Sequence, residues 1–112
     1  CLNSIANQIF KDFEVVIIND ASSGLDLEGR NCKKIVKAFS KKIKNHVNYV
    51  EHTENKFLVE TRRDLVYEAK GKYILMVDSD DYLEPEALFL LSEKAIVNYI
   101  TNLATKDLTD LF

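Results

Sequence analysis

Three aspartates directly follow a short apolar run, and this junction constrains the fold of the chain more than any other feature. Residues 73–77 read Tyr-Ile-Leu-Met-Val, and Asp78, Ser79, Asp80 and Asp81 come next. A continuous apolar run of this length predicts a buried strand of a parallel sheet. Ligands in open α/β sheets bind beyond the carboxyl ends of the strands. The sequence therefore gathers negative charge where a ligand is expected.

The acidic run is best interpreted as a cation site. Ionised carboxylates this close repel one another, and a hard divalent cation with oxygen ligands relieves the repulsion. A solvated turn is the alternative interpretation. A calcium-binding helix–loop–helix loop is disfavoured because Leu83 stands where the turn glycine belongs and Phe89 where the bidentate glutamate belongs. A phosphatase that forms an aspartyl phosphate would also use an Asp-x-Asp pair, but Tyr82 stands where Thr or Val is usual.

The length and composition fit one globular domain over residues 1–112. A chain of 112 residues suffices for one compact domain, and 46% hydrophobic with 29% charged residues is ordinary for a soluble protein. The net charge of -3 gives no general attraction to nucleic acid. Cys1 and Cys32 lack the spacing of metal ligands and suit a reducing compartment. We therefore expect a cytoplasmic protein.

One segment of the chain is strongly basic. Its lysines are Lys33, Lys34, Lys37, Lys41, Lys42 and Lys44. A solvated helix face is the simpler interpretation, and contact with an anionic membrane surface is the alternative. No stretch reaches the roughly 18 apolar residues of a membrane-spanning helix. Any membrane contact would therefore be peripheral, at the inner face of the cell membrane.

Strands and helices alternate along the chain. Strands are predicted at residues 13–19 and 47–52, ahead of the apolar run. Helices are predicted at residues 27–42, 58–69 and, with Pro85 in the first position, from there to about Leu103. This alternation predicts an α/β fold with a mostly parallel sheet and right-handed crossovers. Residues 1–8 indicate the tail of a further helix, so we expect residues to precede Cys1.

Two charged residues elsewhere are candidates for the same site. Asp20 follows the first predicted strand and would share a rim of the sheet with the acidic run, although a helix cap or turn is an alternative role. Arg62 falls on the helical stripe made by Leu58, Leu65, Val66 and Ala69. An arginine there must extend to solvent, pair with a carboxylate or face a bound anion. Its neighbour Arg63 is predicted to lie at the surface.

The two histidines are interpreted as structural. His46 and His52 flank the second predicted strand, and neither has a partner at the spacing of metal ligands.

Several segments resemble family 2 glycosyltransferases, which have the GT-A fold. Residues 11–22 (KDFEVVIINDAS) resemble the family's second-strand segment, and residues 69–83 (AKGKYILMVDSDDYL) its metal-binding segment. Residues 1–8 are similar to its first helix. Residues 55–65 stand where the family has a glycine-containing stretch that ends in Ala-Arg-Asn-x-Gly. The resemblance covers about residues 1–91, whereas residues 92–112 match no part of the family.

The middle segment departs from the family pattern at three positions. Phe57 and Leu65 replace glycines, and Arg63 replaces the asparagine. Phe57 would narrow the donor pocket.

The resemblance implies a partial nucleotide-sugar-binding domain, a three-layer αβα arrangement that is incomplete. Asp20 would accept a hydrogen bond from the base, most often uracil, and Arg62 would lie near the base or the diphosphate. Asp78 and Ser79 would contact the nucleotide-sugar. Asp78 and Asp80 would form the Asp-x-Asp motif, with Asp80 the more direct ligand of Mn²⁺ or Mg²⁺. Asp81 would support the motif.

The implied reaction is sugar transfer from a UDP-sugar to a glycan or lipid-linked acceptor, with inversion of the anomeric centre, in a bacterial cell. The metal would stabilise the diphosphate leaving group as a Lewis acid. The catalytic base is expected outside this chain, so no catalytic residue is assigned within it. Two other interpretations stay open: a non-catalytic module that binds nucleotide-sugar or metal, and an α/β domain for phosphoryl transfer.

The resemblance also implies a strand that would precede Cys1 and lie between the second strand and the metal-site strand. Without it, backbone groups on both neighbours lose their partners, which is costly when they are buried. We therefore expect the isolated chain to be marginally stable, to self-associate or to re-pair its strands.

Overall fold

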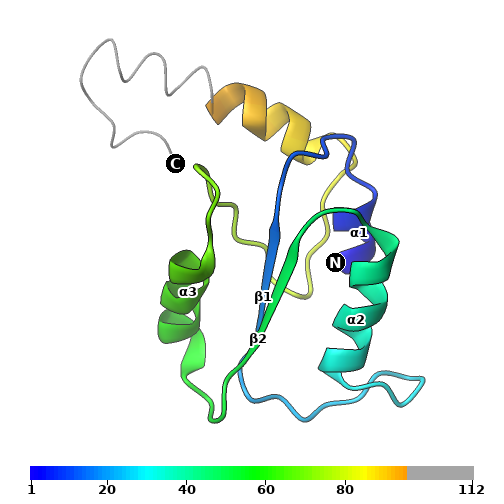
Figure 1. Cartoon of the computed structure of the whole chain (residues 1–112), viewed down its shortest axis with the longest axis vertical. Helices are drawn as coiled ribbons and strands as arrows, with labels where there is room; N and C mark the ends of the chain where they lie inside the picture. The colour runs from blue at the N-terminus through cyan, green and yellow to red at the C-terminus, as the bar shows by residue number, and fades with distance from the viewer. Residues whose placement is uncertain (96–112) are drawn as a thin grey trace. The chain divides into compact units, whose positions relative to one another are not determined.

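The computed structural model describes residues 1–95, which form two compact units (Figure 1). One unit is Asp12–Ile74, and the other combines Cys1–Lys11 with the residues that follow Ile74. The predicted end of the third helix near Leu103 lies outside the described residues.

The Asp12–Ile74 unit is built on two parallel strands. β1 (Val15–Asn19) pairs with β2 (Val47–Glu51), and Val15 lies opposite Val47 in the register. Both strands fall within the segments that the β-branched patterns predict. Parallel strands need a crossover connection, and α2 (Cys32–Lys42) supplies it. The predicted α/β class and the parallel pairing are therefore confirmed.

α2 and α3 (Phe57–Glu68) lie on opposite sides of the strand pair (Figure 1). α2 begins later than residue 27, where the sequence predicted its start. Asn31 caps the helix, because its Oδ1 accepts a hydrogen bond from the Lys34 N–H at 2.9 Å. The residues before the cap form a turn in which Gly29 has a φ of 78° and Asp26 accepts hydrogen bonds from the backbone. This turn keeps the preceding segment out of the helix.

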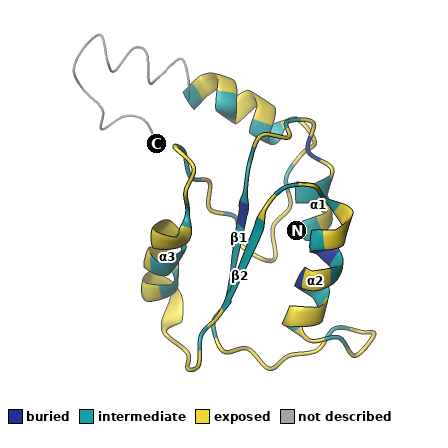
Figure 2. Ribbon diagram, viewed as in Figure 1, coloured by how far each residue is buried: buried dark blue, intermediate teal, exposed yellow. Residues whose placement is uncertain are grey.

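The buried apolar side chains of this unit lie on β1 and α2. The buried apolar side chains among the described residues are Val15, Val36 and Phe39 (Figure 2). Val36 and Phe39 are three residues apart, so they share one face of α2.

The predicted strand at residues 73–77 is wrong for the described structure. No strand forms there, and Leu75 and Met76 are 47% and 40% exposed. Among the described residues the sheet contains only β1 and β2. A strand needs a neighbour's backbone groups as well as an apolar sequence, because its own N–H and C=O groups cannot pair with each other. The apolar pattern therefore indicates that residues 73–77 suit a strand, but it does not say whether a neighbouring strand pairs with them.

The other unit contains α1 (Leu2–Ala6) and a helix over residues 87–95. α1 agrees with the predicted helix tail. The later helix begins two residues beyond Pro85, because the Ala87 N–H donates to the Glu84 carbonyl at 3.0 Å and closes a tighter turn first. None of the helices described is both long and apolar enough to cross a membrane.

Candidate functional site

Residues 78–81 form a tight turn, here called the acidic turn. The Asp81 N–H donates to the Asp78 carbonyl at 3.0 Å, which closes the turn. One carboxylate oxygen from each of Asp78, Asp80 and Asp81 lies within 4.8 Å of the others. All three residues are exposed, and Ser79 lies in the turn between them. The turn therefore gathers three negative charges on the surface.

The donor set of the acidic turn fits a hard divalent cation. Two oxygen ligands on opposite sides of such a cation, at about 2.0–2.6 Å each, lie about 4–5 Å apart. The three carboxylate oxygens lie within 4.8 Å of one another, so their separations do not exceed what ligands of one ion can have. Carboxylate oxygens are the donors that Mg²⁺ and Mn²⁺ prefer. Asp81, predicted only as a supporting residue, belongs to the same cluster as Asp78 and Asp80.

A buried glutamine lies beside the segment that follows the acidic turn. Gln8 is fully buried, at 0% exposure, just beyond the end of α1. Its Nε2 donates to the carbonyls of Ser4 at 3.1 Å and Glu84 at 2.7 Å, and its Oε1 accepts from the Leu88 N–H at 3.0 Å. Sequence reasoning missed this residue, because a polar residue at a helix end gives no signal of burial.

Asp20 lies at the carboxyl end of β1, as predicted, and its carboxylate holds the start of α3. Oδ1 is 2.8 Å from His52 Nδ1 and accepts from the Lys56 N–H at 2.8 Å, and Oδ2 accepts from the Phe57 N–H at 3.0 Å. The hydrogen bond from the Lys56 backbone, followed by that from His52, lowers the pKa of Asp20. Asp20 therefore caps the N-terminus of α3 although it lies after β1 and outside that helix. A helix cap was the alternative role predicted for Asp20.

His52 bridges two carboxylates. Its side chain is 6% exposed, and its Nε2 is 3.0 Å from Asp64 Oδ2 while its Nδ1 contacts Asp20. A hydrogen bond from the Lys56 ammonium is the main cause that lowers the pKa of Asp64. The sequence predicted a structural His52 but not these partners, since Asp20 is 32 residues away along the chain.

The Asp12–Ile74 unit should lose stability in acid. Asp20 and Asp64 have pKa values lowered from 3.8, as does Asp26 beside the Arg30 backbone. The unfolded chain therefore binds protons as the pH falls below about 4, before the folded chain does, so the stability drops in that window. Thermal unfolding between pH 7 and 2.5 checks this. Asp64→Asn should flatten the profile, and Glu54→Gln, an exposed control, should not. A midpoint independent of pH below 4 would contradict the prediction.

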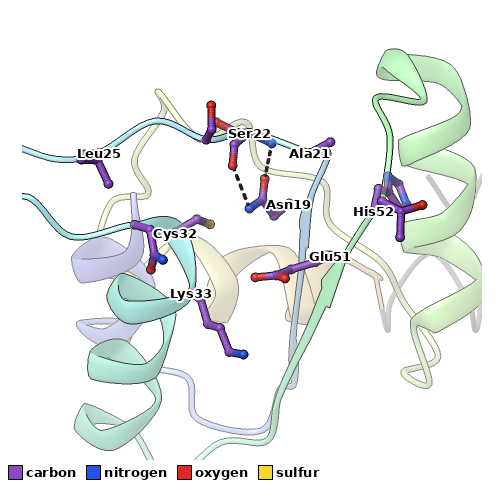
Figure 3. A pocket seen from close by; sticks show the side chains of 11 residues that line it. Asn19, Ala21, Ser22, Leu25, Cys32, Lys33, Glu51 and His52 are labelled. Atoms are coloured by element: carbon purple, nitrogen blue, oxygen red, sulfur yellow. Dashed lines mark hydrogen bonds between the residues drawn. The ribbon is translucent and has the colours of Figure 1, made fainter.

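An open pocket of about 450 Å³ lies at the carboxyl ends of β1 and β2 (Figure 3). The N-terminus of α2 forms its opposite wall. The Asn19 side chain organises one rim, because its Oδ1 accepts from the Ser22 N–H at 2.9 Å. The lining residues are Asn19, Ala21, Ser22, Ser23, Leu25, Asn31, Cys32, Lys33, Glu51, His52 and Thr53. Residues on both sides of Asp20 therefore line the pocket.

Tyr49 lies next to these pocket residues. Its hydroxyl donates to Glu51 at 3.0 Å and accepts from the Asn19 side chain at 3.3 Å. Burial, followed by the nearby Cys32, raises the pKa of Tyr49. The hydroxyl therefore stays protonated at neutral pH and fixes the side chain of Glu51.

The position of Arg62 differs from the predicted stripe. Arg62, Leu58 and Val66 are exposed, whereas Asp64 and Leu65 are partly buried. Asp64 turns inward because it binds His52, and this rotates α3 away from the face that hydrophobicity alone would choose. Arg63 is exposed, as predicted. The described structure therefore gives Arg62 no place in an apolar face.

Two residues near Asp20 have left-handed backbone conformations. Ala21 has a φ of 60° and Phe57 a φ of 66°. Phe57 is 72% exposed, and its N–H donates to Asp20. Such conformations are unfavourable for residues with a Cβ. The hydrogen bonds to Asp20 therefore hold Phe57 in a conformation that suits glycine.

Phe57→Gly is expected to raise the free energy of unfolding by about 0.5–1 kcal/mol, because relief of the left-handed strain exceeds the added chain entropy. Chemical denaturation of both proteins measures this difference. Phe57→Ala is the matched control, since it removes the ring but keeps the Cβ and should give no gain. Equal stabilisation by both substitutions would show that the exposed ring, and not the backbone, is responsible.

The chain is similar to known proteins over most of its length. The model of the family described as "Glycosyl transferase family 2" matches residues 1–103. The chain is 36% identical over 104 residues to glycosyltransferase GlyA of Streptococcus pneumoniae, which covers 93% of this chain and 14% of that protein. It is 38% identical over 91 residues to a poly(ribitol-phosphate) beta-glucosyltransferase of Bacillus spizizenii, covering 79% of this chain and 13% of that protein.

A third relative is also similar to most of this chain over a small part of its own length. Chondroitin synthase of Pasteurella multocida is 34% identical over 114 residues, covering 91% of this chain and 10% of that protein. The chain thus spans only a small part of the length of these relatives, at most 14%. No solved structure matches the chain significantly.

Proposed function

Because the chain belongs to glycosyl transferase family 2, whose members have the GT-A fold, we propose that it binds the donor of a sugar transfer, a UDP-sugar. The observation that carries this proposal is the acidic turn. Its three carboxylate oxygens lie within 4.8 Å of one another, and a divalent cation there would neutralise a diphosphate. The chain spans at most 14% of the length of the three relatives described above, so transfer of the sugar, with inversion at its anomeric centre, is part of the proposal.

The acidic turn would hold the cation, either Mn²⁺ or Mg²⁺. Asp80 and Asp78 are its proposed ligands, and Asp81 is close enough to be a third. When bound, the cation would act as a Lewis acid on the diphosphate. Exposure of the turn leaves room for phosphate oxygens of the donor, and Ser79, between the aspartates, would contact the nucleotide-sugar.

Asp20 would accept a hydrogen bond from the base. Its Oδ2 accepts only the Phe57 N–H among the contacts described, and a carboxylate oxygen can accept two hydrogen bonds. The neighbouring pocket offers space of about 450 Å³. Exposed Arg62 is the proposed partner of the base or the diphosphate, where a guanidinium can bind phosphate in bidentate fashion.

The acceptor is proposed to be a glycan or a lipid-linked saccharide in a bacterial cell. Relatives named for poly(ribitol-phosphate) glucosylation and for chondroitin synthesis support a polymeric acceptor. We also propose peripheral contact with the inner membrane face. All six lysines of the basic segment are exposed, and α2 itself contains no acidic residue.

Calorimetric titration of UDP into the chain, with and without Mn²⁺, tests the proposal. We expect heat of binding only when Mn²⁺ is present, and none for AMP, which lacks both the diphosphate and uracil. A chain that is folded by circular dichroism and binds no UDP would contradict the proposal. Sugar transfer to any acceptor would exclude a module that only binds, and acyl phosphate on Asp78 or Asp80 would favour phosphoryl transfer instead.

A further inference from the structure

The segment after the acidic turn is held by a buried glutamine, and we propose that Gln8 is a positioning residue for the cation ligands. Gln8 contacts no ligand itself. It would act by holding the chain that follows Asp81. This inference rests on the proposed function, because it requires that the acidic turn binds a cation.

Every hydrogen-bonding group of the Gln8 side-chain amide has a partner. The residue is fully buried, and both N–H donors and the carbonyl of its side chain are bonded. The Leu88 N–H that it accepts lies in the first turn of a helix, where backbone N–H groups have no partner inside the helix. A primary amide supplies two donors and an acceptor together, so an apolar or carboxylate side chain cannot make the same set of bonds.

Two backbone-linked contacts extend this anchor. Ser4 Oγ accepts from the Leu83 N–H at 3.0 Å, and the Ile9 N–H donates to the Pro85 carbonyl at 3.0 Å. With the two bonds from Gln8, they fix residues 83–88 against the end of α1. Only Tyr82 separates Asp81 from the first fixed residue.

The acidic turn needs such an anchor because its own charges oppose its geometry. Three carboxylates within 4.8 Å repel one another when no cation lies between them. A turn free to spread would have to be ordered again when a cation binds, which weakens affinity. Fixing one end of the turn limits this spreading, so the ligands are already close before the cation arrives.

Titration of Mn²⁺ into the 112-residue chain, followed by the EPR signal of the free ion, tests the inference. Gln8→Leu is expected to raise the Kd for Mn²⁺ about tenfold, the range seen for residues behind metal ligands. Ser4→Ala removes the bond from the Leu83 N–H, together with the bond that Ser4 Oγ donates to the Cys1 carbonyl, at a less buried position. It is expected to raise the Kd by roughly threefold. Val36→Ala is the control, because it removes buried methyl groups in the other unit; it should lower the melting temperature and leave the Kd unchanged.

The outcomes separate this inference from the proposed function. A wild-type chain that binds no Mn²⁺ would overturn the cation site and the role of Gln8 with it. If the wild type binds Mn²⁺ and both Gln8→Leu and Ser4→Ala bind it with the same Kd, the cation site is retained and the positioning role of Gln8 is overturned. If Gln8→Leu does not fold, Ser4→Ala decides alone, and an unchanged Kd overturns the role. An equal loss of affinity in Val36→Ala would reduce Gln8 to a contributor to stability.

Discussion

Asp80→Asn is expected to weaken Mn²⁺-dependent binding of UDP by about 100-fold or more, since changes even behind metal ligands cost about 10- to 100-fold. Asparagine keeps the shape of the side chain but removes one negative charge from the acidic turn. The cation then loses its most direct proposed ligand, and the diphosphate loses the charge that neutralises it. Calorimetry of UDP binding at fixed Mn²⁺ measures the change.

The matched control is Asp12→Asn, which makes the same chemical change at an exposed residue outside the acidic turn. Its UDP affinity should equal that of the wild type. Asp78→Asn and Asp81→Asn should each weaken binding less than Asp80→Asn. If Asp80→Asn and Asp12→Asn bind UDP equally well, the acidic turn is a solvated surface feature and holds no functional cation.

Asp20→Asn is expected to weaken UDP binding by roughly 10- to 100-fold, the range for hydrogen bonds to a charged group. The carboxylate would be the acceptor for the base, and the amide would present a donor in part of that space. The substitution also removes the charge that faces His52 and the Lys56 N–H. The melting temperature should therefore fall together with the affinity.

Asp64→Asn separates these two effects, because it removes the other carboxylate that His52 contacts without touching Asp20. It should lower the melting temperature and retain most of the UDP affinity. Calorimetry at a temperature where both variants are folded makes the comparison. Similar affinities for the two variants would assign Asp20 to helix capping alone.

The strands and the acidic turn could be predicted because each depends on neighbouring residues. The β-branched run before Asn19 specifies β1 locally, and the three aspartates are close in space because they are close in sequence. The predicted strand at residues 73–77 failed for the opposite reason. Strand formation there depends on a partner elsewhere, and no property of the run itself supplies one.

The contacts of Gln8 and His52 could not be predicted for the same reason. His52 meets Asp20 because parallel pairing brings the ends of β1 and β2 together, and Asp64 follows because α3 starts at Asp20. Gln8 meets Glu84, 76 residues later in the chain. The inward turn of Asp64 in turn displaced Arg62 from the face that hydrophobic spacing predicts. Polar contacts between segments far apart in the sequence therefore determine the partners of Gln8 and His52 and the exposed position of Arg62, none of which follows from the apolar pattern.

The left-handed residues on either side of the Asp20 contact restrict how this segment can change over generations. At positions 21 and 57 the backbone, and not a side-chain contact, decides which residues are accepted. Glycine fits best, asparagine and aspartate are tolerated, and valine, isoleucine and threonine are excluded by their branched Cβ. At position 57 we therefore expect glycine, asparagine and aspartate to be accepted in place of phenylalanine. The cap on α3 can consequently persist while the surface around it diverges.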